Sequence, residues 1–271
     1  SSIPSYKESR RRKPRLVMEY LNLFLPTANP LILFFLISTF LVAGIIKGFL
    51  GMGLPTTVMA LLTLVMEPTA AIPLLTIPIF VTNFAQYIRS PDPLRVAITY
   101  KYFSLSIMIS ILITSMFITS YPQSLLTMTI GFAMVIFSLQ TMFGIKMPVG
   151  SSYKWHVPLG LSSGILGGLS SIWAPPIVMY LISKNYSRDE FVSITGFLFL
   201  SGSVPLALGL YISGILNFDT ALQSLIGLII TLIGFRIGEL MRSKVPQDSF
   251  RKILLVAFLV MGSRLIIQGA L

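Results

Sequence analysis

Long apolar runs are the feature of this 271-residue sequence that most limits the folds open to it. A helix needs about 20 apolar residues to cross the hydrocarbon core of a bilayer. Runs that approach this length recur at 31–46, 69–88, 102–120, 123–143, 191–212, 220–235 and 253–267. Backbone polar groups in lipid must be satisfied within the protein, and uniform runs achieve this as helices rather than as alternating barrel strands. The sequence therefore predicts an all-α polytopic membrane protein.

The distribution of charge indicates what surrounds the protein. Only 11% of the residues are charged, whereas a soluble domain carries about 25%. The net charge of +11 suggests a nucleic-acid partner at first, but the basic residues fall mainly in an N-terminal tail and in short connections between apolar runs. That pattern is typical of membrane orientation. We therefore expect the lipid bilayer, and no nucleic acid, as the large-scale partner.

The N-terminal tail carries the highest density of positive charge. Residues 1–15 hold six basic residues against the single acid Glu8. The excess of positive charge predicts that this tail is cytoplasmic, and residues 16–25 suit a short interfacial helix. We therefore assign 1–28 to a basic cytoplasmic tail with an interfacial helix. The same rule predicts that the basic connections 89–101, 144–156, 184–190 and 241–252 are cytoplasmic.

An internal repeat emerges when the sequence is compared with itself at an offset of 120 residues. Gly44–Pro55 then falls on Gly164–Pro175, with two glycines and the proline coinciding without a gap. The same offset lays Thr82–Asn83 on Gly202–Ser203. Duplicated halves are common in secondary transporters. The repeat therefore predicts two copies of one four-segment unit.

The two copies occupy 29–145 and 146–271. In the first copy the basic connection precedes the third apolar run, and in the second copy it follows that run. This difference indicates opposite orientations in the membrane. The expected fold is thus two inverted halves, each opening with a broken helix, and the topology of the broken segments stays open at this level.

Each copy is interrupted near its start. Four glycines, Lys47 and Pro55 lie within 44–55. Glycine costs about 1 kcal/mol and proline about 3 kcal/mol in a helix interior, so we expect one helix to end near Gly51 and another to begin near Pro55. Irregular backbone at membrane depth lines cavities, and free helix N-termini suit anions. The alternative is that the glycines only permit close helix packing.

Several polar residues lie inside or beside these apolar runs. Lys47 is a functional-site candidate by its depth, unless it snorkels to an interface. Asn83 and Gln86 lie three residues apart on one helical face, although such amides also bond between helices. The candidate substrate-binding residues are Lys47, Gly51, Gly53, Thr56, Thr57, Asn83, Gln86, Ser170, Ser171, Trp173 and Ser203.

The sequence offers little for catalysis. It has no cysteine and one histidine, His156, which argues against thiolate chemistry and most metal chemistry. All nine acidic residues lie in tails, in connections or near the end of a run, so a proton relay built on buried acids has little support. We therefore expect no enzymatic activity, no metal and no cofactor.

The interrupted segments resemble those of a known family. Lys47–Pro55 resembles the glycine-rich break, and Val81–Gln86 the Thr-Asn-x-x-Gln segment, of the TauE/SafE family of sulfite and organosulfonate permeases, also called the toluene sulfonate uptake permease family. Further matches occur in the expected order at Gly164–Tyr180, Gly238–Arg242 and Phe250–Arg251. Many members have three or more consecutive glycines at the first break, which Met52 and Leu54 interrupt here. The resemblance covers about 31–267.

The resemblance implies transport of sulfur oxyanions and no catalysis, and it leaves import or export and the coupling ion open. The predicted function is a secondary transporter for a small sulfur-containing anion such as sulfite, thiosulfate or an organosulfonate, bound near the midplane between the two breaks. An anion channel and a carrier of another small organic anion such as a carboxylate are the alternatives. A membrane enzyme and a partner subunit are weaker candidates. We expect a multi-pass protein of the cell (inner or plasma) membrane, with a homodimer as one possible assembly.

Overall fold

The computed structural model describes residues 30–146, 153–184, 186–242, 244 and 246–271, and all regular structure within them is helical. The α-helices are α2 (Pro30–Leu50), α3 (Leu54–Leu62), α4 (Pro68–Ala71), α5 (Thr76–Ile88), α6 (Pro93–Thr99), α7 (Lys101–Met116), α8 (Gln123–Phe143), α9 (His156–Ser170), α10 (Ala174–Ser183), α11 (Arg188–Ile212), α12 (Phe218–Met241) and α13 (Gln247–Ala270). Short 3-10 helices are η1 (Ile72–Leu75), η2 (Ile118–Ser120) and η3 (Tyr153–Trp155). The tail and interfacial helix predicted for 1–28 lie outside the described residues.

The long helices coincide with the apolar runs of the sequence. Within the described residues, six helical segments are long and apolar enough to cross a membrane. The pair α6 and α7, which meet at a bend of 72°, supplies a seventh if the two are counted as one span. The run 69–88 forms α4, η1 and α5 in succession. The all-α polytopic membrane fold predicted from the sequence is confirmed.

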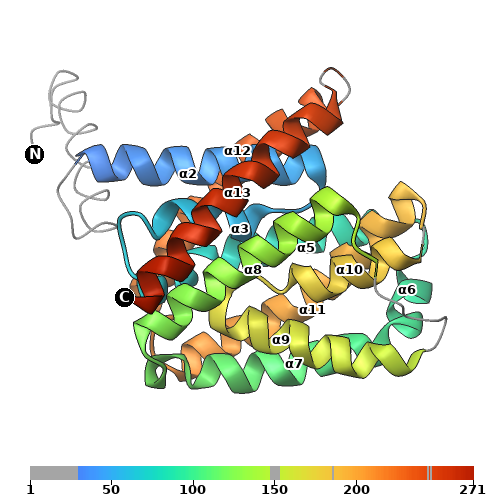
Figure 1. Cartoon of the computed structure of the whole chain (residues 1–271), viewed down its shortest axis with the longest axis horizontal. Helices are drawn as coiled ribbons and strands as arrows, with labels where there is room; N and C mark the ends of the chain where they lie inside the picture. The colour runs from blue at the N-terminus through green and yellow to red at the C-terminus, as the bar shows by residue number, and fades with distance from the viewer. Residues whose placement is uncertain (1–29, 147–152, 185, 243, 245) are drawn as a thin grey trace, which may run out of the picture.

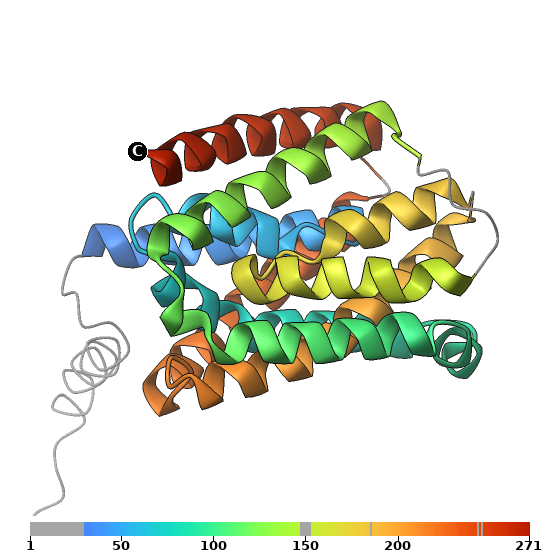
Figure 2. The same ribbon diagram turned by 60° about the horizontal axis from the view of Figure 1, so that its bottom comes forward.

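The helices pair across the two halves of the chain. The first helix of the first half, α2, packs along α12 of the second half, and α9 of the second half packs along α7 of the first. The helices α8 and α13, which end the two halves, pack against each other (Figure 2). Figure 1 shows α2 and α9 running in opposite directions. Exchanging the halves leaves this pairing unchanged, which is compatible with an inverted repeat.

Glycines bring the paired backbones into contact. A Cβ added at Gly44 of α2 would lie 3.0 Å from the backbone nitrogen of Phe235 in α12, and Gly234 meets the α2 backbone in return. Gly131 and Gly262 face each other across α8 and α13, where each added Cβ would lie 2.6 or 2.8 Å from the other's carbonyl oxygen. Small residues allow this close approach in membranes. These glycines therefore allow close packing of the helices. For Gly44, this agrees with the alternative stated for the glycines of 44–55, that they only permit close helix packing.

The contact at Gly44 predicts a sharp difference between neighbouring positions. Gly44→Leu would push a side chain into the α12 backbone, which cannot move aside, and we expect a loss of about 1–3 kcal/mol or more of stability. Val42→Leu on the exposed face of α2 should leave stability unchanged. Thermal unfolding of the purified variants in detergent measures both. Equal melting temperatures would mean that α2 and α12 are not in backbone contact.

The direction of α2 bears on membrane topology. Successive contacts of Gly44 and Gly48 with Thr231 and Phe235 show that α2 and α12 run parallel. The start of α2 therefore lies at the same end of the molecule as the start of α12 and the C-terminus (Figure 1). The basic connection 241–252 lies at the other end. Residues 1–29 are outside the described part, so the cytoplasmic tail stays a prediction.

Cysteine labelling tests this arrangement cleanly because the natural chain has no cysteine. We expect Ser120→Cys and Lys244→Cys, at exposed positions on opposite ends of the bundle, to react with an impermeant maleimide from opposite sides of the membrane. The sequence predicts that the tail and the connection 241–252 are both cytoplasmic, and with α2 starting at the Ser120 end this requires the chain to cross the membrane before Pro30. In that case Ser5→Cys should react from the same side as Lys244→Cys. Reaction of Ser5→Cys from the Ser120 side would show the predicted tail location to be wrong.

Candidate functional site between the two helix breaks

Both predicted breaks begin with the same kind of helix cap. The helix α2 is closed by Gly51, with φ of 82°, whose N–H donates to the Lys47 carbonyl at 2.8 Å. The helix α9 is closed by Ser171, with φ of 60°, whose N–H donates to the Gly167 carbonyl at 2.7 Å. Both are left-handed helix caps. The new helices α3 and α10 then begin at positions 120 residues apart, as the sequence offset predicts.

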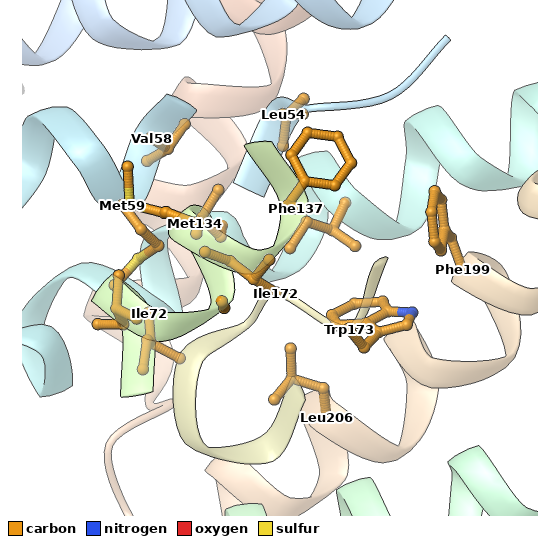
Figure 3. Packing of buried hydrophobic residues seen from close by; sticks show 14 of the residues in the cluster. Leu54, Val58, Met59, Ile72, Met134, Phe137, Ile172, Trp173, Phe199 and Leu206 are labelled. Atoms are coloured by element: carbon orange, nitrogen blue, oxygen red, sulfur yellow. The ribbon is translucent and has the colours of Figure 1, made fainter. Parts of the chain in front are cut away.

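The breaks meet in one buried cavity. It measures about 20 Å³, which is room for about one water molecule. Figure 3 shows Leu54 from the first break and Ile172 and Trp173 from the second, with Phe199 of α11 beside them. The predicted site residues in its lining are Lys47, Gly53, Thr56, Asn83, Ser171 and Trp173.

Lys47 is the charged group in this lining. Its side chain is 2% exposed, so the snorkelling alternative does not apply. Its Nζ donates to Asn83 Oδ1 at 2.7 Å and lies 5.5 Å from the centroid of the Phe199 ring, within reach of a cation–π interaction. None of the carboxylates in the described part of the chain lies within 4.0 Å of this ammonium. The described part of the chain therefore offers Lys47 no carboxylate partner.

Two further polar groups in the lining lack partners. The Oγ of Ser171 and the Nε1 of Trp173 are buried, and neither has a hydrogen-bond partner among the described residues. Buried polar groups are almost always paired, so orphans call for an explanation. The Trp173 backbone is itself held in place, because its carbonyl accepts a hydrogen bond from the hydroxyl of Ser163. Two residues of the cavity lining thus carry a buried donor without a partner among the described residues.

The backbone at Ser171 is strained. Among the described residues, it is the one non-glycine residue with positive φ, a conformation that costs a residue with a Cβ about 1–2 kcal/mol. The matching position of the first half, Gly51, carries the residue that avoids this cost. Strain of this kind concentrates at functional sites. At position 171 a glycine would adopt the same backbone conformation at a lower free-energy cost than serine.

The two helix N-termini at the cavity differ in the donors they offer. The first turn of an α-helix has N–H groups without intrahelical partners, and Leu54 and Thr56 in the first turn of α3 line the cavity. The helix α10 presents Ala174, but Pro175 and Pro176 have no N–H to offer. The first turn of α3 therefore has more N–H groups to offer than the first turn of α10.

The other predicted site residues lie behind the cavity wall. The cavity lining does not include Gly51, Thr57, Gln86, Ser170 or Ser203. Gln86 Nε2 instead donates to the Val192 carbonyl at 2.8 Å and so ties α5 to α11, and Ser203 Oγ donates to the Phe199 carbonyl at 2.8 Å. Their part in binding stays a prediction.

Some residues of the cavity wall were not among the site residues predicted from the sequence. Ile79, Thr82 and Phe199 also line the cavity. Thr82 carried a signal, because it adjoins Asn83 in an apolar run. Ile79 and Phe199 carried none, because an apolar residue inside an apolar run gives no sign of the side it faces.

A comparison with protein families decides what kind of protein contains this cavity. The family model described as "Sulfite exporter TauE/SafE" matches residues 36–265, which include both breaks and every residue of the cavity lining. The chain belongs to this family. No curated protein and no solved structure matches it. The TauE/SafE match and the apolar helices together identify a multi-pass membrane protein of a transporter family.

His156 takes no part in the TauE/SafE cavity. It is 4% exposed, and its Nε2 lies 2.9 Å from the Tyr180 hydroxyl. The described residues contain no group of three His, Cys, Asp or Glu side chains that could hold a metal ion.

The strain at Ser171 predicts a difference between two small substitutions. Both Ser171→Gly and Ser171→Ala remove the hydroxyl, but only alanine keeps a Cβ in the left-handed conformation. We expect Ser171→Gly to be more stable than Ser171→Ala by about 1 kcal/mol. Denaturation of the two purified variants measures this difference, and alanine as the more stable of the two would refute the strain.

Proposed function

We propose that this TauE/SafE protein is a secondary transporter that binds a small sulfur-containing anion, such as sulfite, thiosulfate or an organosulfonate, between its two helix breaks. The observation that carries the proposal is the buried ammonium of Lys47 without a carboxylate partner. An isolated charge in a low-dielectric interior costs several kcal/mol. A neutral amide oxygen from Asn83 offsets part of this cost, and an anionic cargo would offset the rest.

The polar groups of the cavity select the chemistry of its ligand. A lysine ammonium has three N–H donors and no acceptor, and the bond to Asn83 uses one of them. The Ser171 hydroxyl and the Trp173 indole N–H add unpaired donors. A ligand that satisfies this set must offer several acceptors and negative charge. An oxyanion meets both conditions, whereas a metal cation or an amine meets neither.

The charge of the site suits an anion of one or two charges. Lys47 supplies one positive charge, and the N-terminus of α3 adds the equivalent of about half a charge. The contribution of α10 is smaller because two of its first residues are prolines. A monovalent oxyanion is therefore compensated within the site, and a divalent one depends strongly on Lys47.

The size of the cavity favours a carrier over a channel. About 20 Å³ accommodates a water molecule, whereas an oxyanion of sulfur has at least four heavy atoms. The cargo can enter only if the walls separate. A site that must open and close around its ligand is expected of alternating access, while an open pore requires a continuous path.

The family supports the cargo class. Its description names sulfite and export, and on this ground we assign a sulfur oxyanion in preference to a carboxylate. The proposed location is the inner or plasma membrane. The direction of transport and the coupling ion can be measured in liposomes with proton and sodium gradients imposed in turn. Light scattering of the purified protein tests for a homodimer.

The test is anion binding to Lys47→Met and Asn83→Leu. We expect the parent to bind sulfite or thiosulfate more tightly than acetate. Lys47→Met should weaken binding about tenfold or more, and it should penalise divalent anions more than monovalent ones. Asn83→Leu should weaken both classes because it leaves the ammonium without its fixed partner. Calorimetric titration across the pH range in which sulfite gains its proton measures these affinities.

Lys101→Met is the matched control. Lys101 is an exposed lysine at the start of α7, far from the cavity lining, so its loss should leave affinity unchanged. If Lys47→Met, Asn83→Leu and the parent bound sulfite equally well, the site would lie elsewhere. If acetate bound best, the cargo class would be wrong although the site was right.

A further inference from the structure

The two halves of the chain differ at residues that line the cavity. At the offset of 120 residues, Lys47 of the first half corresponds to Gly167 of the second, and Thr82 corresponds to Gly202. Both first-half residues line the cavity, and both second-half counterparts lack a side chain. If both halves carried the same residues at these positions, the repeat would give two related polar subsites, one from each half.

The next pair of matching positions shows the reverse difference. Gly53 of the first break has φ of 95° and no side chain. Its counterpart is Trp173, with φ of −106° and the largest side chain available. In the first half, large side chains at 47 and 82 therefore accompany a glycine at 53. In the second half, glycines at the two matching positions accompany a tryptophan at 173.

The Trp173 side chain lies on the two glycines of its own half. A Cβ added at Gly167 would lie 2.7 Å from Trp173 Cβ and 3.1 Å from its Cε3. A Cβ added at Gly202 would lie 2.9 Å from Trp173 Cε2 and 3.0 Å from its Nε1. The indole thus fills the volume that side chains at these two positions would need.

The indole also forms a fixed wall of the cavity. Trp173 is 2% exposed and meets the Phe199 ring edge to face, with centroids 6.3 Å apart and an interplanar angle of 86°. Figure 3 shows its nitrogen on the edge that faces Phe199. The Lys47 Nζ lies 5.5 Å from the centroid of the Phe199 ring, and Lys47, Trp173 and Phe199 all line the cavity. An anion in this cavity would therefore meet the Lys47 ammonium and the indole of Trp173 within one small space.

We propose that Trp173 occupies the second, symmetry-related subsite and thereby limits the cargo to one small anion of the size of sulfite or thiosulfate. The inference rests on the proposed function. Once the walls separate, an anionic head can approach Lys47, but an organic tail would have to enter the volume that the indole fills. Organosulfonates with bulky tails should therefore be excluded by this one residue, and a smaller residue at 173 should admit them.

The first experiment measures affinity against cargo size. Sulfite, thiosulfate, methanesulfonate, ethanesulfonate and benzenesulfonate are titrated calorimetrically into the purified parent, Trp173→Leu and Trp173→Gly. Parent affinity should fall steeply as the tail grows. The Trp173 variants should bind thiosulfate more weakly, because they lose the indole N–H donor, but the ratio of their benzenesulfonate affinity to their thiosulfate affinity should be at least about tenfold higher than that of the parent.

Trp155→Leu is the matched control, because Trp155 is the only other tryptophan of the sequence and is 38% exposed at the start of α9. Its size profile should equal that of the parent. If the parent binds no sulfur anion, the proposed function fails and the inference fails with it. If the parent binds sulfite and the Trp173 variants keep its size profile, only the inference is overturned.

A second measurement leaves Trp173 intact, so it stands even if removing the indole prevents folding. Trp155→Phe makes Trp173 the sole tryptophan of the chain. Because the indole borders the cavity, saturation with thiosulfate should change its fluorescence emission, and Lys47→Met in the same background should abolish the change at that concentration. Unchanged emission at saturating thiosulfate, with binding verified by calorimetry, would remove Trp173 from the site and overturn the proposal.

Discussion

The buried ammonium of Lys47 is the constraint on which the rest of the site depends. It lies in the interior of a membrane protein with one amide oxygen, from Asn83, as its hydrogen-bonding partner. Such a charge persists only where the surrounding fold is stable enough to bear its cost, or where a ligand neutralises it. The unpaired donors of Ser171 and Trp173 beside it favour the second explanation, because acceptors in the protein would have served stability better.

The fold provides that stability through close backbone contacts. Each break belongs to a helix that is paired along its length with a helix of the other half, α2 with α12 and α9 with α7. Glycines set the separation of these pairs. The two irregular segments are therefore held at the ends of closely packed units, and both halves of the chain contribute to one cavity. A packing role for some glycines and a site at the breaks are thus complementary.

The sequence predicted those features whose residues are energetically unfavourable in their local setting. Glycine and proline inside an apolar run disfavour a helix, so both breaks could be located before the structure was known, and Lys47 and Asn83 stood out because polar groups in lipid are costly. The rotation of each helix could not be predicted. Gln86 is one turn from Asn83, yet its amide faces α11 and not the cavity, and Phe199 gave no signal among its apolar neighbours.

The prolines and the tryptophan of the second break show why a repeat does not give a symmetric site. Two helix N-termini face the cavity, but Pro175 and Pro176 remove donors from one of them, and Trp173 fills the space beside it. The first half supplies Lys47 and the free N–H groups of α3. One half therefore provides most of the positive potential, while the other provides shape and two rigid donors. This division of roles favours the proposed arrangement, in which a single anion lies nearer to the residues of the first half.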